Sequence, residues 1–183
     1  MQNETIAIHA GYNKKEGNGS MAVPITQTTA YAFRDSEHAA NLFALKELGP
    51  IYTRLTNPTT DVLEQRFAAL EGGAAAICVA SGQSAIFYAV ANVAEAGDNI
   101  LISDKLYGGA VTLLSHTMKR FGITTKVFRS EDASNLEEQI DGKTKAIFFE
   151  SLSNPQIAIT DVEKVVEIAK RHGVLTICDN TVA

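Results

Sequence analysis

Four short polar segments of this 183-residue chain carry groups that could do chemistry. The first is Ser81-Gly82-Gln83-Ser84, which lies between a predicted strand and a predicted helix. A glycine at such a turn lets backbone N–H groups approach an anion at the positive end of the helix. Strand–helix turns also contain Gly and Ser for geometry alone, so this segment by itself does not distinguish a phosphate site from an ordinary turn.

The other three segments also follow predicted strands. Tyr107-Gly108-Gly109 places an aromatic ring where it could stack on a planar cofactor, although a surface turn has the same pattern. Ser153-Asn154-Pro155 is a common turn sequence. Asp179 follows the last strand, where its carboxylate could cap a helix, face solvent, or pair with the ring nitrogen of a bound cofactor.

Alternating strands and helices position these segments. Residues 74–80 form an apolar run without alternation, which is typical of a strand buried on both faces. The further predicted strands are 99–103, 123–128, 146–150 and 174–178, and the predicted helices between them are 83–94, 110–121, 135–140 and 161–172. This order predicts a mainly parallel α/β sheet. Ligands bind beyond the carboxyl ends of such strands, so we expect Gly82, Tyr107, Asn154 and Asp179 at one edge.

The N-terminal part has a different pattern. Glycines and a proline predict that residues 1–35 form an irregular arm. A helix is predicted from Ser36, its cap, to residue 48, where Gly49-Pro50 stops it, and a second helix is predicted over residues 60–70.

Composition excludes several classes of protein. The net charge of −5 argues against nucleic-acid binding, and no apolar stretch is long enough to span a bilayer. The start of the chain lacks the pattern of a secretory signal, so we expect a cytoplasmic protein. Cys78 and Cys178 lie in apolar runs without metal-ligand spacing, and we expect them to be small core residues in a reducing compartment.

In their order and spacing, the four segments resemble the Cys/Met-metabolism family of pyridoxal-5′-phosphate (PLP) enzymes. The resemblance covers nearly the whole chain and includes further motifs upstream: Ile51-Tyr52-Thr53-Arg54, Asn57-Pro58-Thr59, Leu63-Glu64 and Leu70-Glu71-Gly72. Within the family, Ala30-Tyr31-Ala32-Phe33 and the long form of residues 39–49 look most like the O-acetylhomoserine sulfhydrylases.

The resemblance implies an α/β fold of the aspartate-aminotransferase type (fold type I), here truncated. It divides the chain into residues 1–59, an arm and helix that reach the neighbouring subunit, and residues 60–183, an incomplete PLP-binding large domain. It also implies that Tyr52 and Arg54 bind the phosphate of the neighbour's cofactor, for which the planar fork of arginine is suited.

The resemblance implies roles for the remaining site residues. Ser81, Gly82 and Gln83 bind the cofactor phosphate, the last two through backbone N–H groups. Three further roles concern the ring: Tyr107 stacks on it, Asn154 hydrogen-bonds its phenolic oxygen, and Asp179 keeps its nitrogen protonated. Thr181 lies close to the ring. Tyr107 and Asp179 are the predicted catalytic residues, and we expect no metal.

The activity implied is a PLP-dependent γ-replacement of methionine biosynthesis, which converts O-acetylhomoserine and sulfide to homocysteine and acetate. The implied partners are copies of the same chain, in a homodimeric catalytic unit and a homotetramer. A sister enzyme of the cystathionine γ-synthase or methionine γ-lyase type remains an alternative. So does a non-catalytic truncated chain, because the family's Schiff-base lysine is expected past Ala183 and the chain as given should not turn over.

Overall fold

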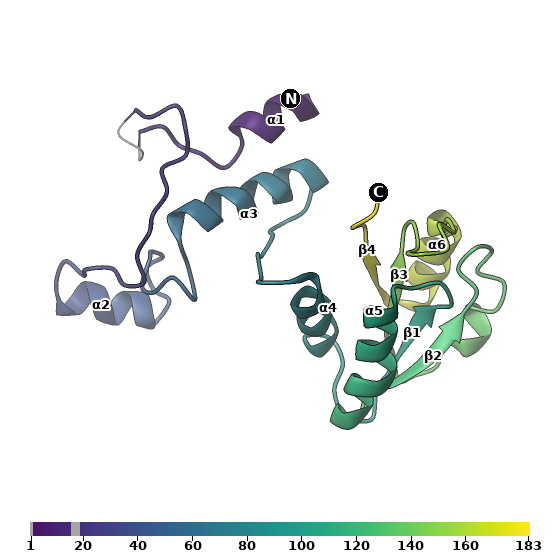
Figure 1. The fold of residues 1–183 in the computed structure, drawn as a ribbon. Coiled ribbons are helices and arrows are strands. Elements are labelled where there is room, and N and C mark those ends of the chain that lie inside the picture. Colours follow the sequence, from purple (N-terminus) through teal and green to yellow (C-terminus); the bar gives the residue numbers. More distant parts are fainter. Residues whose placement is uncertain (1, 16–18) are drawn as a thin grey trace. The chain divides into compact units, whose positions relative to one another are not determined.

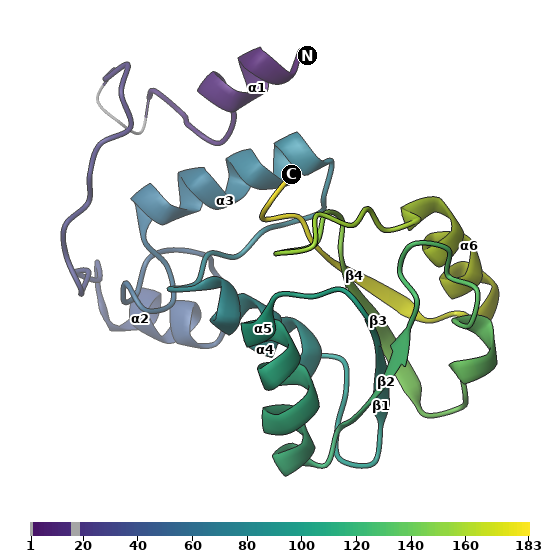
Figure 2. The same ribbon diagram turned by 45° about the vertical axis from the view of Figure 1, so that its right-hand side comes forward.

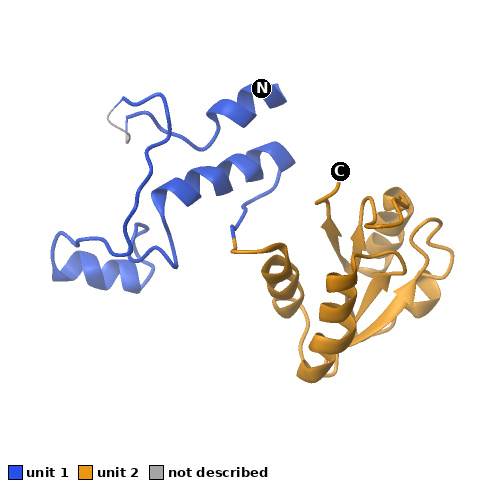
Figure 3. Ribbon diagram, in the orientation of Figure 1, with its two compact units in different colours: residues 1–78 blue, residues 79–183 orange. Residues whose placement is uncertain are grey.

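The structure is a computed structural model that describes residues 2–15 and 19–183 (Figure 1). Residues 1 and 16–18, which belong to the predicted arm, lie outside the described residues. The chain forms two compact units, residues 1–78 and 79–183 (Figure 3). The predicted division after Thr59 rests on the role expected of the N-terminal part in a neighbouring subunit, and it stays a prediction.

The second unit is built on a four-stranded sheet in which every pair of neighbouring strands is parallel. The strands are β1 (Asn99–Ser103), β2 (Thr124–Phe128), β3 (Thr144–Glu150) and β4 (Leu175–Asp179), in the spatial order β2-β1-β3-β4. Figure 2 shows them side by side, with helices along the sheet. The predicted parallel α/β sheet is therefore confirmed.

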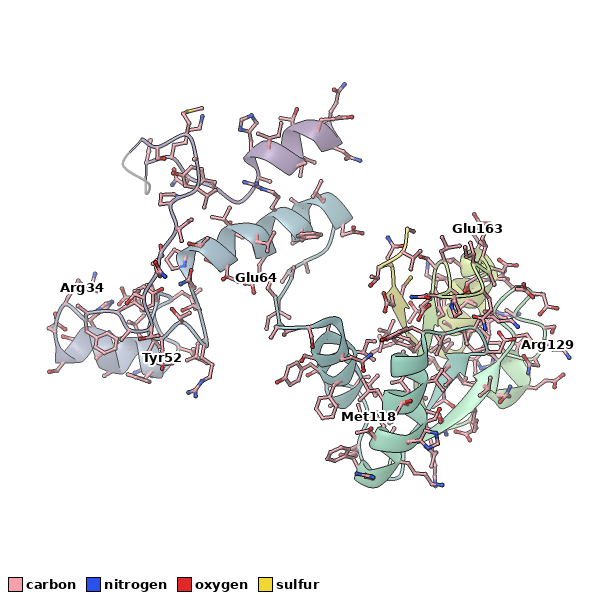
Figure 4. The ribbon with its side chains drawn as sticks, viewed as in Figure 1. Arg34, Tyr52, Glu64, Met118, Arg129 and Glu163 are labelled. Atoms are coloured by element: carbon pink, nitrogen blue, oxygen red, sulfur yellow. The ribbon has the colours of Figure 1, made fainter. Side chains whose placement is uncertain are left out.

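Helices cover both faces of this sheet. On one face, α4 (Gly82–Ala91) and α5 (Gly108–Thr112), which continues through a π turn (Leu113–Thr117) and a 3-10 turn (Met118–Phe121), pack on alternate residues of β1 and β3. The core on that face includes Ile100, Ile102, Phe148, Val90 and Met118, the last of which is labelled in Figure 4.

The opposite face of the sheet packs on α6 (Val162–His172). Its core includes Leu101, Ile147, Phe149 and Val165, each at most 1% exposed. Side chains that alternate between two buried faces explain why these strands are continuous apolar runs. Each such side chain contributes about 1.5–3 kcal/mol through burial. The predicted helix 135–140 is only a 3-10 turn, Glu137–Gln139.

One predicted strand is wrong. Residues 74–80 form no strand and are mostly exposed, with Ile77 at 83%. The sheet of the described chain contains only β1 to β4, and an apolar run becomes a strand only where a neighbouring strand supplies its hydrogen bonds. Cys78 lies on this irregular segment and Cys178 on the edge strand β4, so both cysteines are exposed and the prediction that they lie in the core is also wrong.

The first unit contains three helices in its described part: α1 (Asn3–His9), α2 (Ser36–Phe43) and α3 (Pro58–Glu71). Helix α1 corrects the prediction of a wholly irregular arm. Helix α2 is shorter than predicted, because Leu45 has a positive φ of 55°, and its cap is Asp35 rather than Ser36. No helix in residues 2–15 and 19–183 has the length and apolar character needed to cross a membrane.

A hydrogen-bonded network ties the amino ends of the strands together around Asp141. Its carboxylate accepts hydrogen bonds from Lys126 Nζ at 2.7 Å, Asn99 Nδ2 at 2.9 Å and the backbone N–H of Lys143 at 2.8 Å. Thr144 Oγ1 donates to Asn99 Oδ1 at 2.8 Å, so β1, β2 and β3 all join the network. These hydrogen bonds hold the pKa of Asp141 well below its ordinary value of 3.8, and the bond from Lys126 has the largest effect.

The network predicts a specific acid sensitivity. Because the pKa of Asp141 is lower in the folded chain than in the unfolded chain, ionised Asp141 stabilises the fold. This contribution to the free energy of unfolding is fully present above the ordinary pKa of 3.8 and is lost as the pH falls toward the pKa of the folded state. In the full-length protein, Asp141→Asn should therefore make the free energy of unfolding less dependent on pH between about pH 4 and pH 2. Denaturant titrations across this range measure it. Glu131→Gln, at an exposed carboxylate that makes no hydrogen bond or ion pair with the described residues, should keep the parent's pH dependence. An unchanged pH dependence in Asp141→Asn would contradict the prediction.

Candidate functional site

A cavity of about 440 Å³ lies in the second unit, at the carboxyl ends of the strands. This volume is within the range of small-molecule sites. The residues that line it come from α4, from the strand ends and from the loops that follow them: Ser81, Gly82, Gln83, Ile86, Tyr107, Glu150, Asn154, Asp179, Thr181 and Val182. The structure thus brings together all seven site residues that the sequence predicts for this unit. A larger cavity, about 750 Å³, lies in the first unit and contains none of the predicted site residues.

The parallel sheet explains this convergence. Glu150 at the end of β3 and Asp179 at the end of β4 are partners in the ladder, so they stand side by side on one face of the sheet. The loop after β1 brings Tyr107 to the same edge, where its backbone N–H donates to Glu150. Parallel strands end at a common edge, so residues far apart in sequence meet there.

The first turn of α4 supplies hydrogen-bond donors to the cavity. Ser81 is the N-cap, and its Oγ accepts from the N–H of Ser84 at 3.1 Å. The next N–H, of Ala85, makes the first intrahelical bond to the carbonyl of Ser81 at 3.0 Å. The N–H groups of Gly82 and Gln83 precede that bond and have no intrahelical acceptor. A β-carbon at Gly82 would meet no atom within 4 Å, so there is open space beside this turn where an anion fits.

Tyr107 lies at the start of α5 and is half exposed to the cavity. A β-carbon at Gly109 would lie 2.5 Å from Cε1 of Tyr107 and 2.9 Å from Nε2 of Gln83. Atoms do not approach that closely, so the glycine leaves the room that the tyrosine ring and the Gln83 side chain occupy. A β-carbon at Gly108 would meet nothing within 4 Å.

Glu150 and Asn154 bring β3 and its following loop into the site. Asn154 is exposed, and it precedes Pro155 through a cis peptide bond. Glu150 is only 3% exposed, and its two carboxylate oxygens accept from the N–H groups of Tyr107 at 2.8 Å and Asn154 at 3.0 Å. Sequence analysis missed Glu150. The available signal was a glutamate at the end of a strand that is otherwise apolar.

Asp179 is held by Thr181. Its Oδ1 accepts from the backbone N–H of Thr181 at 2.9 Å and from its hydroxyl at 2.6 Å. The carbonyl of Asp179 accepts from the N–H of Ser151 at 3.1 Å, which continues the β3–β4 pairing. Asp179 makes no ion pair with a cationic side chain of the described chain, so its carboxylate can pair with a cationic group on a ligand.

Tyr52 and Arg54 lie in the first unit, and both are exposed (Tyr52 is labelled in Figure 4). The guanidinium carbon of Arg54 is 5.6 Å from the ring centre of Tyr52, in the range of a cation–π contact. The buried side chain of Asn57 fixes their segment: it donates to the carbonyl of Thr26 at 3.0 Å and to the hydroxyl of Thr53 at 3.2 Å. Their action on a neighbouring subunit stays a prediction.

The donor set fits PLP. Two N–H groups at a helix N-terminus suit its phosphate, an aromatic side chain suits its ring, and a carboxylate suits its ring nitrogen. All three lie around one cavity large enough for the cofactor. No cluster of side chains in the described ranges could hold a metal ion.

Comparison with known proteins gives concordant results. A family model described as "Cys/Met metabolism PLP-dependent enzyme" matches residues 4–183. Over 97% of its length the chain is 48% identical to an O-acetyl-L-homoserine sulfhydrylase of Leptospira meyeri, and it spans 40% of that protein.

Two solved structures are similar over almost the whole chain. One, from Campylobacter jejuni, is described as an O-acetylhomoserine (thiol)-lyase and contains N′-pyridoxyl-lysine-5′-monophosphate. It is 56% identical to this chain with a TM-score of 0.96, and the match covers 100% of this chain and 45% of the Campylobacter chain. The other is a cystathionine gamma-lyase of Lactobacillus plantarum, 32% identical with a TM-score of 0.88 over 99% of this chain and 45% of its own. The chain thus spans less than half the length of these relatives.

Two adjacent glycines allow a matched test of the ring site. In the full-length protein, Gly109→Ala should displace the Tyr107 ring and weaken PLP binding about 2- to 10-fold, the equivalent of the roughly 0.5–1.5 kcal/mol of an aromatic contact. Gly108→Ala places its methyl group in open space, so PLP affinity should not change and stability should change by at most about 1 kcal/mol. PLP titration followed by absorbance measures both variants. Equal affinities for the two would show that Gly109 does not position the ring.

Proposed function

Because the chain belongs to the Cys/Met metabolism family of PLP-dependent enzymes, we propose that the full-length protein converts O-acetylhomoserine and sulfide to homocysteine and acetate by γ-replacement. The observation that carries this proposal is the cavity at which the donors of α4, Tyr107, Asn154 and Asp179 converge. The identity to the sulfhydrylase of Leptospira meyeri supports the choice of reaction within the family. The proposal concerns the full-length protein, since the chain spans less than half of its relatives.

The first turn of α4 anchors the cofactor. The N–H groups of Gly82 and Gln83 bind the phosphate, where the helix dipole adds to their effect. Ser81 shapes this turn, because its hydroxyl accepts from the N–H of Ser84 and leaves the two preceding N–H groups available to the anion.

When bound, PLP supplies an electron sink for negative charge that develops at the substrate Cα. The carboxylate of Asp179 binds the ring nitrogen and holds the proton there, and Thr181 keeps that carboxylate oriented. Tyr107 packs its ring on the pyridine plane, and the side chain of Asn154 donates to the phenolic oxygen. Tyr107 and Asp179 thus contact the reactive ring directly.

Tyr52 and Arg54 complete the phosphate site of a neighbouring subunit in this proposal. A phosphate dianion binds tightly where N–H donors and a cation converge, and α4 supplies only the donors. The catalytic unit is then a homodimer, assembled into a homotetramer, and the protein acts in the cytoplasm in methionine biosynthesis.

A sister reaction of the cystathionine γ-synthase or methionine γ-lyase type is the second candidate, because the cystathionine gamma-lyase of Lactobacillus plantarum shares this fold with a TM-score of 0.88. The cofactor residues are expected to be common to both reactions, so the nucleophile must be tested directly.

We expect the purified full-length protein with PLP to form homocysteine from O-acetylhomoserine and sulfide, detected by mass spectrometry. Formation of cystathionine when cysteine replaces sulfide, or of methanethiol from methionine, with no homocysteine from sulfide, would favour the sister reaction. A PLP-loaded protein that forms none of these products would refute both.

Asp179→Asn should slow exchange of the substrate Cα proton with deuterium by on the order of 10²-fold, since a neutral amide cannot hold the ring proton. Proton NMR of the substrate in deuterated buffer measures the rate. Thr181→Val is the matched control: it removes the hydroxyl but keeps the backbone N–H that binds the same oxygen, so its effect should be smaller. Near-parental exchange in Asp179→Asn would refute the assigned role.

Mixed dimers test the action of Arg54 across the interface. Arg54→Ala damages the neighbour's site and Asp179→Asn damages the subunit's own site. A dimer of one Arg54→Ala subunit and one Asp179→Asn subunit therefore has one doubly altered site and one intact site. Homocysteine formation should rise on mixing the two variants and should not rise when either is incubated alone. If mass spectrometry shows that subunits exchange but activity does not recover, Arg54 does not act in the neighbour's site.

A further inference from the structure

Glu150 has a buried carboxylate at the centre of the site. The proposed reaction gives this residue no role. The residue is 3% exposed, and it makes no ion pair with a lysine, arginine or histidine of the described chain. Burying a carboxylate without a cation is costly unless its oxygens receive hydrogen bonds. The structure gives each of them a backbone N–H donor, so this side chain is held in place by main-chain groups.

The two donors belong to two different loops. The N–H of Tyr107 in the β1–α5 loop donates to Oε1 at 2.8 Å, and the N–H of Asn154 in the β3–α6 loop donates to Oε2 at 3.0 Å. We call these two hydrogen bonds the Glu150 bridge. They join backbone groups 43 and 4 positions from Glu150 in sequence. The separation between the two loops is thereby set by the dimensions of one carboxylate.

The base of the Glu150 bridge is fixed by the sheet. Glu150 pairs in register with Asp179 on β4, and its own carbonyl accepts from the hydroxyl of Thr160 at 2.6 Å. The pairing of β3 with β4 therefore sets the position from which the carboxylate projects, and the Thr160 bond attaches the far end of the β3–α6 loop to the backbone of the same residue. The loops that hold Tyr107 and Asn154 are thereby anchored to β3, which pairs with β4, the strand that ends at Asp179.

We propose that Glu150 is a positioning residue that holds Tyr107 and Asn154 at a fixed separation, so that the two contact one cofactor ring together. This inference rests on the proposed function, because it assigns the ring contacts to those two residues. Glu150 itself need not touch the ring. Its effect is exerted through backbone N–H groups, and the side chains of Tyr107 and Asn154 remain available to the ligand.

Glu150→Gln tests the Glu150 bridge with almost no change in shape. The glutamine side chain has one acceptor oxygen and one NH₂ group, so it can accept from only one of the two backbone N–H groups. In the full-length protein without cofactor, hydrogen exchange at the Tyr107 or Asn154 amide should accelerate about 10- to 100-fold. The dissociation constant for PLP should rise about 10-fold, because one ring contact loses its position.

Thr160→Val is the matched control. It removes a hydrogen bond from the same loop to the carbonyl of Glu150 but leaves both oxygens of the carboxylate in place. It should leave protection at both amides and PLP affinity near the parental values even if its melting temperature falls. A merely structural role of Glu150 would instead affect the two variants alike, in proportion to their loss of stability.

The outcomes separate the inference from the proposed function. Glu150→Gln with PLP affinity and both amides unchanged would overturn the inference alone, provided that the parent binds PLP. A parent that binds no PLP would overturn the proposed function, and the role given to Glu150 would fall with it. If Glu150→Gln does not fold, the unmodified protein still tests the inference: rapid exchange at both the Tyr107 and the Asn154 amides would show that the Glu150 bridge does not form.

Discussion

The parallel direction of the four strands is the constraint on which the rest of the second unit depends. It puts all carboxyl ends at one edge, where Glu150, Asp179 and the loops with Tyr107 and Asn154 meet. It also gathers the amino ends at the opposite edge, where the Asp141 network joins β1, β2 and β3. Groups that stabilise the sheet and groups that can bind a ligand are therefore separated by the length of the strands.

Much of this fold could be predicted from the sequence because its signals are local. Residues 99–103 and 146–150 are apolar runs that the sheet buries on both faces, and Gly72 and Gly173 end their helices with positive φ, as glycine allows. The run 74–80 carries the same local signal but forms no strand in the described chain. Hydrophobicity indicates that a segment can be buried, but it does not specify the neighbouring strand that must pair with it.

Most residues of the site could also be predicted from the sequence, and the one that was missed depends on contacts between distant segments. Gly82, Tyr107, Asn154 and Asp179 stand in turns whose residue types suggest ligand contacts, and the structure places all four around one cavity. Glu150 is marked in sequence only as a glutamate that ends an apolar strand, and its partners are not marked at all, because they are backbone N–H groups that every residue except proline possesses. The distinction between Gly108 and Gly109 has no sequence signal, since it depends on where the Tyr107 ring lies.

The hydrogen bonds that each carboxylate already accepts explain how Glu150 and Asp179, which lie side by side, can have different roles. Glu150 and Asp179 are register partners on adjacent strands, and both are acceptors when ionised. Both oxygens of Glu150 are engaged by backbone N–H groups, which hold that side chain in place where it lines the cavity. In Asp179, Thr181 engages only Oδ1, and the described chain supplies no hydrogen bond to Oδ2. The less buried Asp179 can therefore accept a hydrogen bond from a protonated group of a ligand, while the more buried Glu150 holds the two loops that carry Tyr107 and Asn154.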